Sequence, residues 1–243
     1  GQLGGLPEEQ RAASFQHQGS TLSLQGPGPT QALASTSLLT FNGIVVQSLS
    51  QTNFSGAGGA DIAVLTDSVA GSTVAFAAGS SYAISDLQIH GGSGASGLIN
   101  LRSQTPSTAW SLSLQAVSSV TSASVQDSSC LSPVCHANDG TSLAGSGNTN
   151  WNFNPSLMTL APGETFTEGV GRGGAASPRT AGVAFALTVK AVSSNLNSVP
   201  SSVAGAALAW NEVNVSTPAS LSLVSGATIF SNVVLRTAQS AVA

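Results

Sequence analysis

The feature that most constrains the fold is a series of short apolar runs that never lengthen into a helix. From about residue 36 the runs alternate apolar and polar residues, as in Trp110, Leu112 and Leu114, which is the period of a half-buried β-strand. Gly, Ser, Asn or Pro lies between the runs and favours turns there. The sequence therefore predicts an all-β protein. The strands expected first along the chain are 38–46, 62–65, 73–76, 82–89, 98–101, 110–114 and 120–125.

These runs recur at a short and even spacing. There is roughly one run per 10–13 residues, which is typical of a β-sandwich or a β-solenoid. Only 7% of the residues are charged and small residues are frequent, which favours a solenoid whose Gly and Asn residues form tight corners. We expect a short β-helix or β-solenoid-like domain over 35–153.

The sequence divides into three segments. Residues 1–34 are rich in Gln, Gly and Pro without sustained periodicity, which predicts an extended or flexible N-terminal arm. Phe15 and the run Leu22-Ser23-Leu24 could supply one short strand within it. A Gly- and Pro-rich stretch near 154–182 predicts a domain boundary. Strand-like runs resume at 184–192, 206–210, 221–223 and 229–236. Residues 157–243 are therefore expected to form a second, smaller β-sandwich.

Charge and hydropathy exclude several classes of protein. The 243 residues carry a net charge of −4, so there is no basic footprint for nucleic acid. A hydrophobic content of 41% argues against disorder. No run of 18 apolar residues exists, so no membrane span is expected. The chain begins GQLGG, which we interpret as a mature or excised form.

The most distinctive local motif is Cys130-Leu-Ser-Pro-Val-Cys135-His136. The short spacing predicts a local disulfide between Cys130 and Cys135, and with it an oxidising compartment. A c-type haem site with His136 as axial ligand is an alternative, although its usual spacing is C-x-x-C-H. A metal site that adds Asp139 to these residues is another. The second haem ligand would be Met158, His90 or His17. We predict neither cofactor nor metal.

No constellation of catalytic residues emerges. The carboxylates are scattered, and glycosidase chemistry needs a pair within roughly 5–9.5 Å; only a fortunate register would stack Asp86 with Asp127. No G-x-S-x-G motif is present. Trp110, Trp151 and Trp210 lie in strand-like runs, where core packing is favoured over sugar stacking. We therefore expect no enzyme and no catalytic residue.

Two stretches resemble known modules of bacterial surface proteins. The first is SSYAISDLQIHGGSGASGLINLRSQTPSTAWSLSLQAVSSVTSASVQDSS, followed by GSGNTNWNF. It covers about 72–153 and resembles the β-helical repeat unit of filamentous-haemagglutinin-like proteins. The second is APGETFTEGVGRGGAASPRTAGVAFALTVKAV, followed by SLVSGATIFSNVVLRTA. It covers about 158–243 and is similar to bacterial immunoglobulin-like (Ig-like) modules, but AGAALAWNEVN replaces their usual polar strand.

The resemblance implies extracellular, non-catalytic building blocks. We expect a structural protein of the cell surface: a subunit or segment of a filament, sheath, surface layer or adhesin that self-associates through strand edges into a homopolymer or array. Cell-surface glycans are a second candidate partner. The alternatives are a carbohydrate-binding or carbohydrate-cleaving β-helix and an extracellular c-type cytochrome that uses Cys130, Cys135 and His136.

Overall fold

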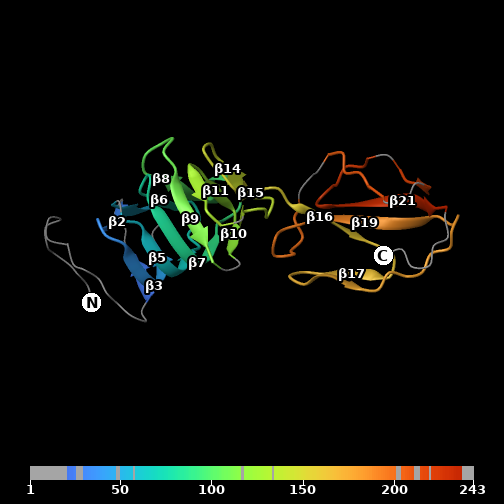
Figure 1. Ribbon diagram of the computed structural model, residues 1–243, viewed down its shortest axis with the longest axis horizontal. Helices are drawn as coiled ribbons and strands as arrows, with labels where there is room; N and C mark the ends of the chain where they lie inside the picture. The colour runs from blue at the N-terminus through green and yellow to red at the C-terminus, as the bar shows by residue number, and fades with distance from the viewer. Residues whose placement is uncertain are drawn as a thin grey trace.

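The chain folds into two all-β lobes that lie end to end (Figure 1). The computed structural model describes residues 21–25, 30–47, 50–56, 58–115, 118–132, 134–200, 204–210, 214–218 and 220–236. The N-terminal lobe holds β1 to β15, and the C-terminal lobe holds β16 to β21. Within these ranges the one helical element is the short 3₁₀ helix η2 (Ala95–Gly97). No helix of the described residues is long and apolar enough to cross a membrane.

The N-terminal lobe is a β-solenoid of about five turns. Two parallel sheets form its walls, and the chain alternates between them. One sheet contains, in order, β1 (Thr21–Leu24), β3 (Leu39–Val46), β5 (Ala60–Asp67), β7 (Ser81–His90), β9 (Trp110–Leu114) and β12 (Ser128–Cys130), with β10 (Ser119–Thr121) also beside β7. The other contains β14 (Leu143–Ala144), β11 (Ala123–Val125), β8 (Ile99–Ser103), β6 (Thr73–Phe76), β4 (Gln51–Ser55) and β2 (Thr30–Ala34).

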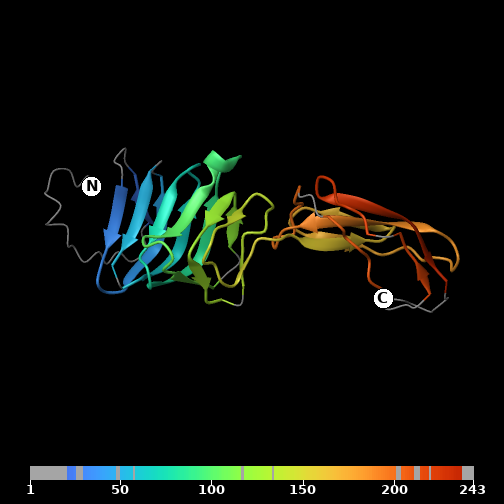
Figure 2. The same cartoon turned by 90° about the horizontal axis from the view of Figure 1, so that it is seen from above.

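The strand register explains the spacing seen in the sequence. Leu39 pairs with Ala60, and Ala60 pairs with Tyr82, so one turn takes 21 or 22 residues there. Most turns contribute one strand to each sheet, which gives one strand for about every 11 residues. The exception is the turn in which β9 and β10 both lie beside β7. The predicted solenoid fold is confirmed. Figure 2 shows the strands of successive turns side by side along the lobe.

The register also builds the core, because equivalent residues of successive turns stack on one another. Ile44, Leu65 and Leu87 occupy one such column and are almost fully buried. Aromatic rings continue the core: Phe76 stacks on Trp110 with 3.9 Å between ring centroids and on Phe54 with 5.4 Å. Each aromatic contact adds about 0.5–1.5 kcal/mol to the burial of its rings.

Sharp corners in the backbone lead the chain from one sheet to the other. Ser122 has a φ of 48°, a left-handed conformation that L-residues seldom adopt. It separates β10 from β11, which lie in different sheets. Residues 120–125, predicted as one strand, are therefore two short strands around a corner. The error arose because the apolar alternation continues through the corner.

The solenoid begins earlier than predicted. Strands β1 and β2 lie inside the segment 1–34 that was expected to be an arm. Their pairing with β3 and β4 extends the parallel sheets, because Leu22, Leu24 and Leu33 supply apolar side chains to the same core. The boundary at residue 35 is thus too late, and residues 1–20 and 26–29 lie outside the described chain.

The C-terminal lobe is antiparallel and has a core of its own. A four-stranded sheet has the order β16 (Ser156–Leu160), β19 (Phe185–Val192), β21 (Ala227–Leu235), β20 (Val215–Ser216), and β17 (Glu164–Thr167) pairs with β18 (Gly171–Gly174). Leu187, Val189, Phe230 and Val233 are buried in its core. The predicted Ig-like sandwich is not confirmed. Strands β16, β17 and β18 also lie where the sequence predicted a boundary region, 154–182, because Gly and Pro there occupy turns between strands rather than a linker.

Candidate functional site

The Cys130–Cys135 disulfide forms as predicted. Cys130 ends β12, and Cys135 begins β13 (Cys135–His136), which pairs with β15 (Trp151–Asn152) at the end of the solenoid. The two sulfur atoms are 2.09 Å apart, and both residues are almost fully buried. Haem attachment and thiolate–metal binding both require free thiols. In this oxidised state each sulfur is instead bonded to the other.

The other residues considered for haem or metal binding are dispersed. His90 ends β7, where its Nε2 is 3.0 Å from the Ser119 hydroxyl. Met158 lies on β16 of the C-terminal lobe. His17 lies outside the described residues. In the described part of the chain, no three His, Cys, Asp or Glu side chains are grouped so that they could hold a metal ion.

The carboxylates Asp86 and Asp127 are not brought together. Asp86 is in the middle of β7, where it accepts a hydrogen bond from Gln88. Asp127 lies at a corner, at the same height in the solenoid as Gly79. The Asp127 carbonyl accepts a hydrogen bond from Trp110 N–H, and the carbonyl of the preceding residue, Ala109, accepts one from Gly79 N–H. The part of β7 from Ser81 to Asp86 separates these levels, or roughly 17 Å, which is beyond the spacing of a glycosidase pair.

The tryptophans also occupy structural positions. Trp110 is fully buried in the solenoid core. Trp151 is half-buried against the same core; its indole N–H donates to the Ser128 hydroxyl, and its ring stacks on Phe153. Trp210 packs against the core of the C-terminal lobe. None of the three is an exposed platform for a sugar.

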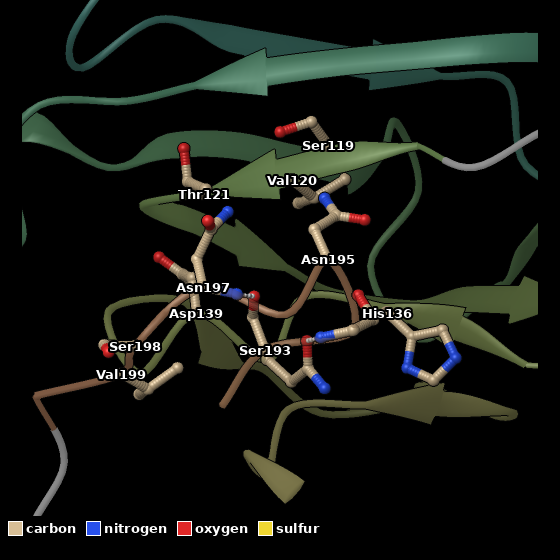
Figure 3. A pocket seen from close by; sticks show the side chains of 12 residues that line it. Ser119, Val120, Thr121, His136, Asp139, Ser193, Asn195, Asn197, Ser198 and Val199 are labelled. Atoms are coloured by element: carbon tan, nitrogen blue, oxygen red, sulfur yellow. Dashed lines mark hydrogen bonds between the residues drawn. The ribbon is translucent and has the colours of Figure 1, made fainter. Parts of the chain in front are cut away.

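The feature that the structure adds is a cavity between the two lobes, here called the junction cavity, which is lined mostly by Ser, Thr and Asn residues. It has a volume of about 190 Å³. Strand β10 and the segment after β13 form one wall, and the loop after β19 forms the other; in Figure 3, Asn195 of this loop points toward β10 and His136 lies to one side. The lining residues are Ser119, Val120, Thr121, His136, Asn138, Asp139, Ser193, Ser194, Asn195, Asn197, Ser198 and Val199.

Asp139 fixes the solenoid wall of the cavity. Its carboxylate accepts hydrogen bonds from the Ser122 and Ser142 amides and from the Thr141 hydroxyl. Burial alone would raise the pKa of this carboxyl, but the hydrogen bonds outweigh it and hold the pKa below its ordinary value. Asp139 is thus ionised at neutral pH, and its oxygens are engaged in holding the corner at Ser122.

Asn138 joins the two lobes. Its Oδ1 accepts a hydrogen bond of 2.9 Å from the Ser194 amide across the junction, while its side-chain Nδ2 is buried without a partner in the described structure. The Nδ1 atom of His136 is likewise buried and without a described partner. Buried polar groups are nearly always hydrogen-bonded to protein, water or ligand. Two buried polar atoms beside the junction, Asn138 Nδ2 and His136 Nδ1, therefore have no hydrogen-bond partner among the described residues.

Sequence reasoning weighed only His136 and Asp139 of these residues, and for a different chemistry. The loop 193–199 and Asn138 carry no local motif, and they meet only because two lobes abut. Comparisons of the chain with protein-family models, with curated proteins and with solved structures each returned no match.

Proposed function

We propose that this chain is an extracellular structural protein, a subunit or segment of a surface filament, sheath, surface layer or adhesin. In this proposal copies of the chain join head to tail through strand edges. The observation that carries it is the N-terminal end of the solenoid, where no strand of the described residues lies beyond β1 and β2. In the described part of the chain, β1 pairs only with β3, and β2 pairs only with β4.

The backbone groups at this end can be assigned to a side. The Leu24 carbonyl accepts from Gln47 N–H, and Ser35 N–H donates to the Ser55 carbonyl, so these two residues point into the ladder. Because the direction alternates along a strand, Ser23 on β1 and Ala32 on β2 direct their N–H and C=O groups away from the solenoid. Such unpaired edges are templates for strand addition.

The overall arrangement supports one partner, a second copy of the chain. The open edge lies at the end of the molecule remote from the C-terminal lobe (Figure 2), and the four-stranded sheet of that lobe ends in β16 and β20. A contact between two different ends does not close on itself and produces a fibre. The low charge of the chain weakens repulsion between copies.

The extracellular part of the proposal rests on two further supports. A disulfide persists in oxidising compartments and is rare in the cytosol, and Cys130 and Cys135 form one. The resemblance of 72–153 to filamentous-haemagglutinin-like repeats and of 158–243 to Ig-like modules is the second support. Both classes of module build surface proteins without catalysing a reaction.

The decisive variant removes the outward N–H groups at the open edge. Ser23→Pro with Ala32→Pro deletes one outward donor from each edge strand and leaves the donors that face β3 and β4 in place. We expect the wild-type chain to form fibres in negative-stain micrographs and the double variant to sediment as a monomer.

The matched control is Ser23→Ala with Ala32→Ser, which keeps both N–H groups and should assemble normally. Thermal melting of both pairs checks that the solenoid stays folded. A wild-type chain that remains monomeric at high concentration would overturn the proposal, as would a proline variant that still polymerises. Deleting residues 1–20 then tests the N-terminal arm separately, since a cut at residue 30 would remove β1 itself.

A further inference from the structure

We propose that the peptide bond between Arg179 and Thr180 is a processing site for a trypsin-like protease, one that cuts after arginine. The proposal is independent of strand-edge assembly. It starts from the segment that joins β18 to β19. Every residue of 175–184 is exposed, and none of them belongs to a strand or a helix. Exposed segments of small and polar residues are where folded proteins are cut most readily.

The backbone around this bond is only lightly held. A protease must draw several residues on either side of the cut bond out of the protein, so the cut depends on local opening. Three backbone hydrogen bonds hold the segment 175–184, and their donors are the amides of Ser177, Gly182 and Val183. The N–H and carbonyl groups of Arg179 itself bond to no other backbone group of the described residues. Opening here therefore breaks few bonds and disturbs no buried side chain.

The side chain of Arg179 is also within reach of a protease. Its guanidinium donates to the carbonyls of Ser177 and Pro162 and lies 5.7 Å from the centre of the Phe185 ring. Both hydrogen bonds are exposed, so water replaces them at little cost. The specificity pocket of a trypsin-like protease holds an aspartate that pairs with such a guanidinium. Residues 170–184 contain two arginines and no Asp or Glu, so the segment does not repel an acidic pocket.

The other basic residues of the described chain are held in paired backbone. Arg102 lies in β8, Arg172 in β18 and Lys190 in β19, and each has a partner on the neighbouring strand. The Arg236 amide donates to the Asn214 carbonyl at the end of β21. A cut beside any of the three strand residues requires that a sheet opens first. Arg179 is therefore the favoured position.

The reaction is a hydrolysis that breaks the C–N bond between Arg179 and Thr180. Water supplies a hydroxyl to the Arg179 carbonyl carbon and a proton to the Thr180 nitrogen, which leaves a carboxylate and an ammonium group after proton transfer. The first piece keeps the solenoid and β16 to β18, and the second keeps β19 to β21. The pieces should stay together, because β19 pairs with β16 over five residues in the same sheet.

Limited digestion of the native full chain with trypsin tests the proposal. Mass spectrometry at successive times should find the pieces 1–179 and 180–243 before any cut at the strand residues. Pieces that begin at residue 12 count with those that begin at residue 1, because Arg11 lies outside the described residues. Arg179→Gln should remove this first cut. The matched control is Arg172→Gln, which should be cut after Arg179 at the wild-type rate.

Two results would overturn the proposal. One is that the bond after Arg179 stays intact, or is cut only after Arg102, Arg172 or Lys190. The other is that the two pieces separate on a size-exclusion column under native conditions, which would show that the segment 175–184 is needed to hold the sheet together. We expect them to elute as one species in buffer and as two species in urea.

Discussion

The buried carboxyl of Asp67 breaks the apolar pattern of one column of the solenoid core. Asp67 stands in the same column as Val46 and Ile89 and has no exposed surface. It accepts hydrogen bonds from the Val69 amide and the Ser72 hydroxyl. Burial nevertheless raises its pKa to about 6, because these bonds only partly offset the loss of water. Asp67 therefore holds the turn after β5, and the free-energy cost of burying its carboxyl depends on pH.

The first prediction concerns the variant Asp67→Asn. A folded-state pKa of about 6 lies above the ordinary 3.8, so the stabilising contribution of the protonated acid is complete below pH 3.8 and is lost as pH rises through 6. The rise in the pKa of Asp67 corresponds to about 3 kcal/mol in the free energy of unfolding. Asn keeps an acceptor for Val69 and stays neutral. The variant should therefore be more stable than the wild type at pH 7.5, and this advantage should vanish near pH 4.

Urea unfolding at a series of pH values, followed by tryptophan fluorescence, measures this difference. The matched control is Asp61→Asn, which makes the same substitution on the outer face of the same strand. Equal stability of Asp67→Asn and wild type at pH 7.5 would mean that the Asp67 carboxylate is well solvated in the folded protein.

At the scale of the element, the disulfide loop is an addition to the solenoid rather than its support. The Ser132 hydroxyl bonds to both the amide and the carbonyl of Leu114, so the loop is also held to β9 without the disulfide. Leu131 and Val134 are exposed and contribute little to the core. The main effect of the disulfide is to restrict the unfolded chain.

The second prediction follows for Cys130→Ser with Cys135→Ser. The bridge joins residues only five apart, and the chain-entropy model gives so short a loop about 2 kcal/mol. We expect the free energy of unfolding to fall by that amount while the circular dichroism spectrum is unchanged. Wild-type protein that is unfolded and then refolded in the presence of a reductant should lose the same free energy of unfolding. The reductant should not change the stability of the double variant. Loss of the β-sheet signal in the variant would assign the disulfide a larger role.

At the scale of the whole molecule, the two lobes have separate cores and a narrow polar junction. The two buried clusters share no residue. Among the hydrogen bonds of the described residues, the bond from Ser194 N–H to Asn138 Oδ1 is the one that links the lobes. Separate cores make relative motion of the lobes the default expectation. Asn138 is then the residue that restrains it.

The third prediction tests this restraint. Asn138→Ala removes the acceptor and should broaden the distance distribution between spin labels on exposed Ser81 and Ser231, one on each lobe. Asn138→Asp keeps an acceptor oxygen and should retain the narrow distribution. Electron–electron double resonance measures both. A distribution that is equally narrow in Asn138→Ala would show that other contacts hold the junction.

The sequence by itself determined the all-β class, the solenoid and the disulfide, because these depend on patterns within one turn of chain. Alternation marks a strand, turn residues mark its end, and Cys130 and Cys135 are close enough to meet in any compact loop. It also placed Trp110 in the core. These features need no knowledge of which strand lies beside which.

Only the tertiary structure decided the register and everything built on it. Partners in the two parallel sheets lie from 18 to 31 residues apart, so neither the membership of β1 and β2 nor the corner at Ser122 could be inferred from local alternation. Asp67 is buried because its column neighbours are apolar. Asn138 meets the loop 193–199 because two independently folded lobes abut. Burial and polar contacts of this kind depend on distant residues, and no local pattern records them.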